Sequence, residues 1–423
     1  MATRLALLGG RPVRTRPFPA WPVFGRAEEV RLLKTLRSGR WGRLDGEEVR
    51  RFEERFAAMH GCRHGIAVVN GTVSLRLALI AAGLRAGDEV VVPPYTFFST
   101  ASAVVEANMV PVFADVDLDT FNLDPAAAKA AITPRTRAII PVHFAGQPAD
   151  MDAMMRLARK HRLVVIEDAA HAHGARYGDR PAGSLGHLAS FSFQSSKNLT
   201  CGEGGIITTN DARLAGRCQS LHNCGRVPGG LWYEHHLISG NYRLGEFQGA
   251  VLNAQLDRLD AQTDTRDRNG RYLASRLAAL PGLHPQQRPA ACTRHGYHLF
   301  MLRLDGEAFG APRSAVIEAL RAEGIPCSAG YGFSLPQQPM FRRKAFGPYL
   351  SGAAARLDYG RANVPTSDLL CREQGIWLEQ PLLLGRRADM DDIARAFEKV
   401  HGHGAALSAW ARARRPRRRK EAG

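Results

Sequence analysis

The chain contains the stretch Leu163-Val-Val-Ile-Glu-Asp-Ala-Ala-His-Ala-His-Gly174, in which an apolar run ends in two carboxylates and is followed by two histidines. The run Leu163–Glu167 is typical of a β-strand buried inside a sheet. It places Asp168 at the carboxyl end of that strand, where a carboxylate facing the core is costly unless it has a partner. The ordinary alternative is an aspartate that caps the next helix. The stretch therefore predicts a buried strand that leads into a polar site.

Further short apolar runs alternate with segments of helical spacing around this strand. The expected strands are Gly65–Val69, Glu89–Pro93, Val110–Asp115, Arg137–Val142, Leu163–Glu167, Leu188–Phe193 and Gly205–Thr209. The expected helices between the first five strands are Thr72–Leu84, Thr100–Asn108, Asp124–Ile132 and Asp150–His161. This alternation predicts an α/β fold with a mostly parallel sheet covered by helices on both faces. Ligands of such sheets bind at the carboxyl ends of the strands.

The second half of the chain has a different pattern. Helical spacing continues from Leu244 to Leu280, which is long enough to lead out of a first domain. Beyond it we expect a strand at Tyr297–Leu304, a helix at Pro312–Glu323, a short strand at Pro326–Ala329 and a final helix at Ala388–His401. We therefore predict an N-terminal arm and large domain over residues 1–260, a smaller C-terminal α+β domain over residues 261–405, and a basic, disordered tail over residues 406–423.

Composition and charge limit the class of protein. Hydrophobic residues make up 45% of the chain and charged residues 23%, as in globular proteins, and no apolar run is long enough to cross a membrane. The N-terminus lacks an apolar segment of signal-peptide type, and the seven scattered cysteines form no CxxC pair, so we expect a cytoplasmic protein with free thiols. Seven of the cations behind the net charge of +17 lie in Ala411–Lys420. No aromatic residues alternate with these arginines, which disfavours nucleic-acid binding.

Lys197 stands out among the seven lysines of a chain that has fifty arginines. It follows the strand segment Ser190-Phe-Ser-Phe-Gln194 and comes before the glycine-rich segment Gly202-Glu-Gly-Gly205. This places its amine on a turn at a strand end. Arginine cannot replace lysine where a neutral amine must condense with an aldehyde. A solvated lysine on a surface turn is the alternative that position alone leaves open.

Other strand ends carry groups that suit a phosphorylated, planar ligand. Gly71 and Thr72 begin a predicted helix, whose first backbone N–H groups form a natural phosphate site. Ser192 can add a hydroxyl, and Phe97 can lie flat on a ring, although a core aromatic is the commoner role. With Asp168 for a ring nitrogen and Lys197 for an imine, these are the groups that bind pyridoxal 5′-phosphate.

The histidines of the opening stretch allow a second interpretation. Asp168, His171 and His173, with His143 from another strand end, could in principle bind a metal ion. Their spacings match no known metal signature, so we predict no metal site.

The motifs also resemble those of the DegT/DnrJ/StrS aminotransferases over nearly the whole chain, up to about residue 403. The matching segments are Asn70-Gly-Thr72, Pro94-Tyr-Thr-Phe97, Pro141-Val-His143, Glu167-Asp-Ala-Ala-His-Ala-His-Gly174, Phe191-Ser-Phe-Gln-Ser-Ser-Lys197, Gly202-Glu-Gly-Gly205 and Gly240-Asn-Tyr-Arg-Leu-Gly-Glu-Phe-Gln248. Within this family, Phe18-Pro-Ala-Trp-Pro22 and Pro141-Val-His-Phe-Ala-Gly146 are similar to the branch of cyclitol-ketone aminotransferases and 3-amino-5-hydroxybenzoate synthases.

The resemblance implies the aspartate-aminotransferase fold, which is fold type I among pyridoxal-phosphate enzymes. It also implies a homodimer with active sites at the subunit interface, in which Asn241 reaches the phosphate of the neighbouring subunit's cofactor. His171 would lie next to the cofactor's phenolic oxygen, where many nucleotide-sugar members of the family carry glutamine.

We therefore predict a pyridoxal-phosphate-dependent aminotransferase that moves an amino group from glutamate or glutamine to a keto-cyclitol or keto-sugar. Lys197 would carry the cofactor and act as the base, and Asp168 would pair with the ring nitrogen. The alternatives are a nucleotide-keto-sugar aminotransferase, an aromatising dehydratase of the aminohydroxybenzoate type, and a regulatory or nucleic-acid-binding protein. The polar residues expected near a hydroxylated substrate are His222, Asn223, Arg226, His235, His236, Arg243 and Glu246.

Overall fold

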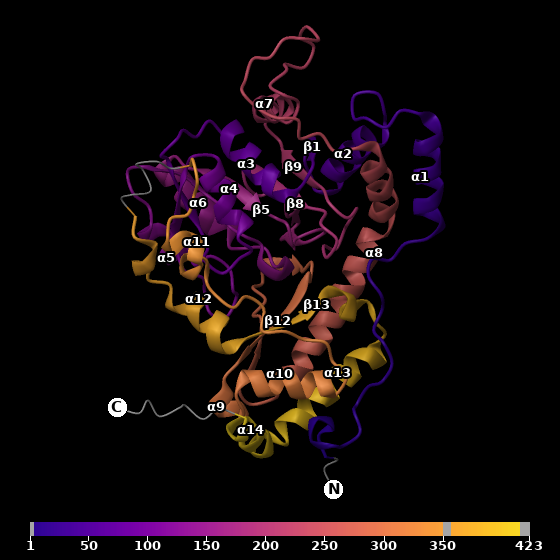
Figure 1. Cartoon of the computed structure of the whole chain (residues 1–423), viewed down its shortest axis with the longest axis vertical. Helices are drawn as coiled ribbons and strands as arrows, with labels where there is room; N and C mark the ends of the chain where they lie inside the picture. The colour runs from indigo at the N-terminus through magenta and orange to yellow at the C-terminus, as the bar shows by residue number, and fades with distance from the viewer. Residues whose placement is uncertain (1–3, 350–356, 415–423) are drawn as a thin grey trace.

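A seven-stranded sheet forms the centre of the larger part of the molecule (Figure 1). The computed structural model describes residues 4–349 and 357–414. In sheet order β1-β9-β8-β5-β4-β2-β3, the strands are His64–Val68, Gly205–Thr209, Leu188–Ser192, Val164–Asp168, Thr136–Ile139, Glu89–Val92 and Val110–Phe113. β9 is antiparallel to both of its neighbours, and the other neighbouring pairs are parallel. All seven predicted strands are present, and the mostly parallel sheet is confirmed.

Helices cover both faces of this sheet, with an apolar core beneath each layer. One layer consists of α3 (Gly71–Ala81), α4 (Ser99–Glu106) and α7 (Ala212–His222). The other consists of α2 (Glu48–Met59), α5 (Pro125–Ala130), α6 (Met151–His161) and the first half of α8 (Glu246–Leu277), with α1 (Arg26–Ser38) outside α8. The alternation of side chains along β2 divides the two cores, because Val90 and Val92 enter the first and Val91 enters the second.

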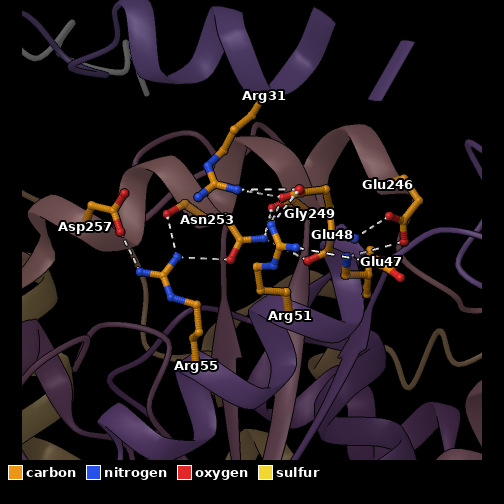
Figure 2. Close-up of polar contacts among 10 residues, drawn as sticks. Arg31, Glu47, Glu48, Arg51, Arg55, Glu246, Gly249, Asn253 and Asp257 are labelled. Carbon is orange, nitrogen blue, oxygen red and sulfur yellow. Dashed lines mark hydrogen bonds and ion pairs between the residues drawn. The ribbon is translucent and has the colours of Figure 1, made fainter. Parts of the chain in front are cut away.

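Polar contacts fix α2 against the beginning of α8 (Figure 2). The Glu246 carboxylate, on a residue that is 1% exposed, accepts hydrogen bonds from the backbone N–H groups of Glu48 (2.6 Å) and Val49 (3.3 Å). Asn253 donates to the Glu48 carbonyl (2.8 Å) and to its carboxylate (2.9 Å). Gly249 lies at the closest approach, where a Cβ atom would come within 2.7 Å of the Val49 nitrogen. The long helix is therefore held in place where it leaves the central sheet.

The second half of α8 joins another core, built on a three-stranded antiparallel sheet. In sheet order, its strands are β10 (Leu283–Pro285), β12 (Leu299–Leu304) and β13 (Gly375–Glu379). The helices that share this core are α10 (Arg313–Ala322) and α13 (Arg387–His401). The remaining strands are β11 (Cys292–Arg294), β6 (Arg176–Tyr177) and β7 (Arg180–Pro181), and the short helices are α9 (Gly306–Phe309), α11 (Pro339–Arg342) and α12 (Pro365–Leu369).

The second sheet differs from the sequence-based expectation in two respects. The strand predicted at Pro326–Ala329 is wrong, because Ser328 forms only a single β-bridge, to Trp377. Two strands of this sheet are not predicted by the sequence, namely β10, which has only three residues, and β13, whose apolar run Ile376–Leu378 is only three residues long. α8 continues unbroken through residue 260, so the domain division at that residue stays a prediction.

Two general features concern the helices and the cysteines. Within residues 4–349 and 357–414, no helix is both long and apolar enough to cross a membrane. All seven cysteines are free, and the buried ones are Cys62, Cys218, Cys292, Cys327 and Cys371. Buried thiols of this kind pack as small apolar side chains.

The tail that the sequence predicts over residues 406–423 is in part a helix. Gly404–Ala413 forms the helix α14, which packs against α10 and buries Leu407 completely. Trp410 packs on the same core. The prediction overlooked that these two side chains, three residues apart, share one face of a helix. The rest of the predicted tail, beyond residue 414, lies outside the described residues.

We expect Leu407→Ala to lower the free energy of unfolding by about 2–5 kcal/mol, because it leaves a cavity between α14 and the core. Chemical denaturation followed by tryptophan fluorescence measures this change. Ala409→Ser, on the exposed face of the same helix, is the control and should change the free energy by less than about 0.5 kcal/mol. Equal stability of the two variants would show that α14 contributes no packing.

Candidate active site

A cavity of about 740 Å³ lies at the carboxyl ends of the central strands and is also lined by the second sheet. The second sheet contributes Leu299 of β12 and Trp377 of β13. Seven of the eight predicted site residues line this cavity, namely Gly71, Thr72, Phe97, Asp168, His171, Ser192 and Lys197. The structure thus brings together residues from four separate segments of the chain at the edge where ligands of such sheets bind.

Asp168 is the last residue of β5 and is 6% exposed. Its Oδ2 accepts a hydrogen bond from the Thr100 hydroxyl (2.7 Å), and its Oδ1 accepts one from the Ala170 N–H (3.2 Å). Burial raises the pKa of this carboxyl, and the Thr100 hydrogen bond opposes the shift. A carboxylate in this position gains free energy from any cationic partner that enters the cavity.

Lys197 lies in the turn after β8, where its backbone N–H donates to the Gln194 carbonyl (2.9 Å). Burial lowers the pKa of its amine to about 8, and the charge of Asp168 opposes part of that shift. In the part of the chain that the structure describes, no hydrogen bond or ion pair holds the Nζ atom. Much of the amine is therefore neutral at mildly alkaline pH, and in that form it attacks carbonyl carbons.

The N-terminus of α3 forms one end of the cavity. Asn70 caps the helix, because its side chain accepts a hydrogen bond from the Val73 N–H (2.9 Å). The cap leaves the N–H groups of Gly71 and Thr72, at the start of the first turn, without a partner inside the helix. A Cβ atom on Gly71 would come within 2.8 Å of the Ser192 Cβ, so only glycine fits at this position. The backbone and the Ser192 hydroxyl together form a cradle that suits a phosphate group.

Phe97 and His171 are the remaining predicted residues in the cavity. The Phe97 residue is 53% exposed and makes an edge contact with Phe98, which leaves a face of the ring accessible. Burial, with the charge of Lys197 adding to it, holds the pKa of His171 well below its ordinary value, so the ring is neutral. Its Nδ1 accepts a hydrogen bond from the Ala145 N–H (3.3 Å). The ring proton therefore lies on Nε2, which makes that atom a donor.

Asn241 does not line the cavity of its own chain. It is exposed, and it pairs with Asn223 through a β-bridge. None of the seven polar residues expected near a substrate lines this cavity either. Glu246 instead caps α2, as described above, and Arg243 donates to the Asn223 side chain (2.5 Å). Within a single chain, the structure does not bring this predicted substrate region to the site.

The histidines considered as metal ligands have other surroundings. The His143 Nε2 lies 2.8 Å from the Glu167 carboxylate, and both residues are fully buried. That carboxylate also accepts three backbone hydrogen bonds, from Gly183, Leu185 and Gly186. Among the described residues, no three histidine, cysteine or carboxylate side chains are arranged to hold a metal ion. His143 and Glu167 therefore form a buried structural network.

Several cavity residues are not predicted from the sequence. They are, among others, Trp21, Thr100, His298, Tyr331, Trp377 and Gln380. Most of them come from the second sheet and its surroundings, or from the N-terminal arm. Trp21 is the exception, because it belongs to the segment Phe18-Pro-Ala-Trp-Pro22, which resembles the family branch and could have indicated it.

The chain is similar to known proteins over most of its length. The model of the DegT/DnrJ/EryC1/StrS aminotransferase family matches residues 24–374. An L-glutamine:2-deoxy-scyllo-inosose aminotransferase of Streptoalloteichus tenebrarius is 40% identical, covering 97% of this chain and 100% of the relative. A 3-amino-5-hydroxybenzoate synthase of Amycolatopsis mediterranei is 38% identical, covering 90% and 98%. The crystal structure of a 3-amino-5-hydroxybenzoic acid synthase has a TM-score of 0.82 at 36% identity, covering 94% of this chain and all of that chain.

The fold and the cavity define an enzyme of the aminotransferase class. This chain belongs to the DegT/DnrJ/EryC1/StrS aminotransferase family. The predicted family, its branch and its fold are confirmed, and the alternative of a non-enzymatic regulatory protein is wrong.

Proposed function

We propose that this aminotransferase uses pyridoxal 5′-phosphate to move an amino group from glutamine or glutamate to a keto-cyclitol. The observation that carries the proposal is that the Lys197 amine and the Asp168 carboxylate share one cavity with the phosphate-binding end of α3. An amine for an aldehyde, a carboxylate for a ring nitrogen and a cradle for a phosphate are the three groups that this cofactor requires.

Each residue fits one part of the cofactor. The Nζ of Lys197 would hold its aldehyde carbon covalently, and Asp168 would accept a hydrogen bond from its protonated ring nitrogen, which would also compensate the buried carboxylate. Ser192 and the first turn of α3 would bind its phosphate. Phe97 would lie against its ring, and the Nε2–H of His171 would donate to its phenolic oxygen. When bound, the cofactor supplies the electron sink that stabilises negative charge on the donor's α-carbon.

Lys197 would have a second role once the donor's amine has displaced it. Its Nζ, for which burial lowers the pKa to about 8, would accept the proton that leaves the donor's α-carbon. The same atom would deliver a proton when the ketone receives the amine. Thr100 would orient Asp168 throughout, because its hydroxyl donates to the carboxylate.

The names of the relatives support a cyclitol ketone as acceptor. The Streptoalloteichus relative is named for 2-deoxy-scyllo-inosose, with L-glutamine as donor. A second candidate function is that of a 3-amino-5-hydroxybenzoate synthase, because both the Amycolatopsis relative and the solved synthase carry that name. The two candidates share Lys197 and differ in the acceptor and the product.

We expect the protein, loaded with cofactor and L-glutamine and freed of excess donor, to aminate 2-deoxy-scyllo-inosose. The near-visible absorbance of the lysine-bound cofactor should return when this ketone is added, and mass spectrometry should find the aminocyclitol. Lys197→Ala should show neither change, and Lys129→Ala, on the surface of α5, is the matched control. Return of the absorbance with nucleotide keto-sugars alone would contradict the proposed substrate, and an aromatic product would establish the second candidate.

We also propose a homodimer in which Asn241 completes the neighbouring subunit's site by binding the cofactor's phosphate. The loop between α7 and α8 projects from the body of the molecule (Figure 1). Asn241 pairs with Asn223, the residue that follows α7, and so lies where the two ends of this loop meet. The large apolar side chains that this loop exposes are Val227, Leu231, Trp232, Tyr233, Leu237 and Ile238. Exposed apolar patches of this kind are typical of surfaces that a partner covers, which supports the dimer.

The free cysteines support a cytoplasmic location.

Mixing Lys197→Ala subunits with Asn241→Ala subunits should restore activity that neither variant has alone. The heterodimer would carry both lesions in one site and leave the other site intact, so up to about half of the wild-type activity per heterodimer is expected. Activity is measured after subunit exchange, which a size-tagged subunit verifies. Mixing two Lys197→Ala preparations is the control. Verified exchange without recovery of activity would contradict a site shared between subunits.

A further inference from the structure

A buried cation without an acidic partner lies behind one wall of the cavity. Arg266 of α8 is fully buried, and burial lowers the pKa of its guanidinium to about 9. It forms no ion pair within the described ranges, and its Nη1 has no hydrogen-bond partner there. The ring of Trp21, a cavity residue, lies 5.3 Å from the guanidinium carbon. A buried charge of this kind costs free energy unless an anion comes close to it.

Gln380 links this cation to the cavity. It follows β13 directly, is 1% exposed and lines the cavity. Its Oε1 accepts hydrogen bonds from the Nε (2.9 Å) and the Nη2 (2.6 Å) of Arg266. The Oε1 atom accepts both hydrogen bonds, so they fix the orientation of the amide and distinguish its oxygen from its nitrogen. The remaining polar atom, Nε2, is buried and has no partner among the residues that the structure describes. The two N–H groups of this amide are therefore donors without an acceptor, on a residue that lines the cavity.

The charge of Arg266 also acts on a residue that lines the cavity. Burial is the main reason why the pKa of the cavity residue His298 lies well below its ordinary value; the charges of His171, Lys197 and His173 add to that effect, and that of Arg266 adds a smaller part. This wall comes from the second sheet and the N-terminal arm, whereas the phosphate cradle comes from α3. The cavity thus has a second place that favours negative charge, in addition to the phosphate cradle.

We propose that Gln380, oriented by Arg266, binds the α-carboxylate of the amino donor. The inference rests on the proposed function, because it takes the donor to be an amino acid. A carboxylate accepts the two N–H groups of the amide and is attracted by the guanidinium behind it. A cyclitol ketone has no carboxylate, so this contact distinguishes the donor from the acceptor in a cavity that binds both in turn. Gln380 touches the donor, and Arg266 is a positioning residue.

The test uses two ligands that cannot react, because both lack the α-amino group. Glutaramate carries a carboxylate and a terminal amide, and glutaramide has the same length without the charge. Calorimetry with the cofactor-loaded wild-type protein should show that glutaramate binds about tenfold more tightly than glutaramide, or better. Equal affinities would overturn the inference while leaving amino transfer from glutamine, and with it the proposed function, intact.

Two substitutions then locate the contact. Gln380→Glu replaces the donor amide by a carboxylate that can pair with Arg266, so it should remove the preference for glutaramate while the protein stays folded. Gln262→Glu, on α8 and outside the cavity, is the matched control and should keep the preference. A Gln380→Glu protein that still prefers glutaramate would overturn the inference.

Arg266→Met and Arg266→Lys test the positioning role. We expect Arg266→Met to raise the KM for L-glutamine about tenfold, with the half-reaction of the ketone unchanged. Arg266→Lys should recover part of the loss, because it keeps the charge. An equal loss in both half-reactions would mean that Arg266 only supports the fold, and it would overturn this part of the proposal.

Discussion

The arrangement of the molecule depends on a carboxylate and an amine that share one buried cavity. Burial acts on both groups in the same sense, since it raises the pKa of Asp168 and lowers that of Lys197 to about 8. Each group is therefore less stable in its charged form than it would be in water. Thr100 and the Ala170 N–H partly compensate the carboxylate, whereas the amine has no partner in the described chain. In the proposed function, one cofactor satisfies both groups.

The rest of the fold keeps these two groups at one edge of the central sheet. Parallel strands place Asp168 and Ser192 at the same edge. α3 begins there with Asn70 as its cap, and glycine at position 71 lets the helix lie against Ser192. α8 then carries the chain to the second sheet, and its attachment to α2 through Glu246 fixes its direction. Along the same helix, Arg266 lies behind the wall of the cavity that Gln380 lines.

The sequence predicts those parts of the site whose position follows from the local pattern of residues. Asp168 and Lys197 follow apolar strands, and Gly71 and Thr72 begin a helix, so their position at the strand ends can be predicted without a structure. Gln380 and Arg266 could not be found in this way, because they are 114 residues apart and neither has a distinctive neighbourhood in the sequence. β13 is not predicted because its apolar run is only three residues long. α14 was missed because the arginines nearby obscure the apolar face that buries Leu407.

Asn241 differs from both of these groups of residues. Only the family resemblance assigns it to an active site, and it lies outside the cavity of its own chain. The assignment of Lys197, in contrast, can be tested within a single subunit. Borohydride reduction of the cofactor-loaded protein, followed by peptide mapping, is the most direct measurement. A stable pyridoxyl group on the peptide that contains Lys197 is the predicted result. A pyridoxyl group on any of the other six lysines, with Lys197 unmodified, would contradict the account.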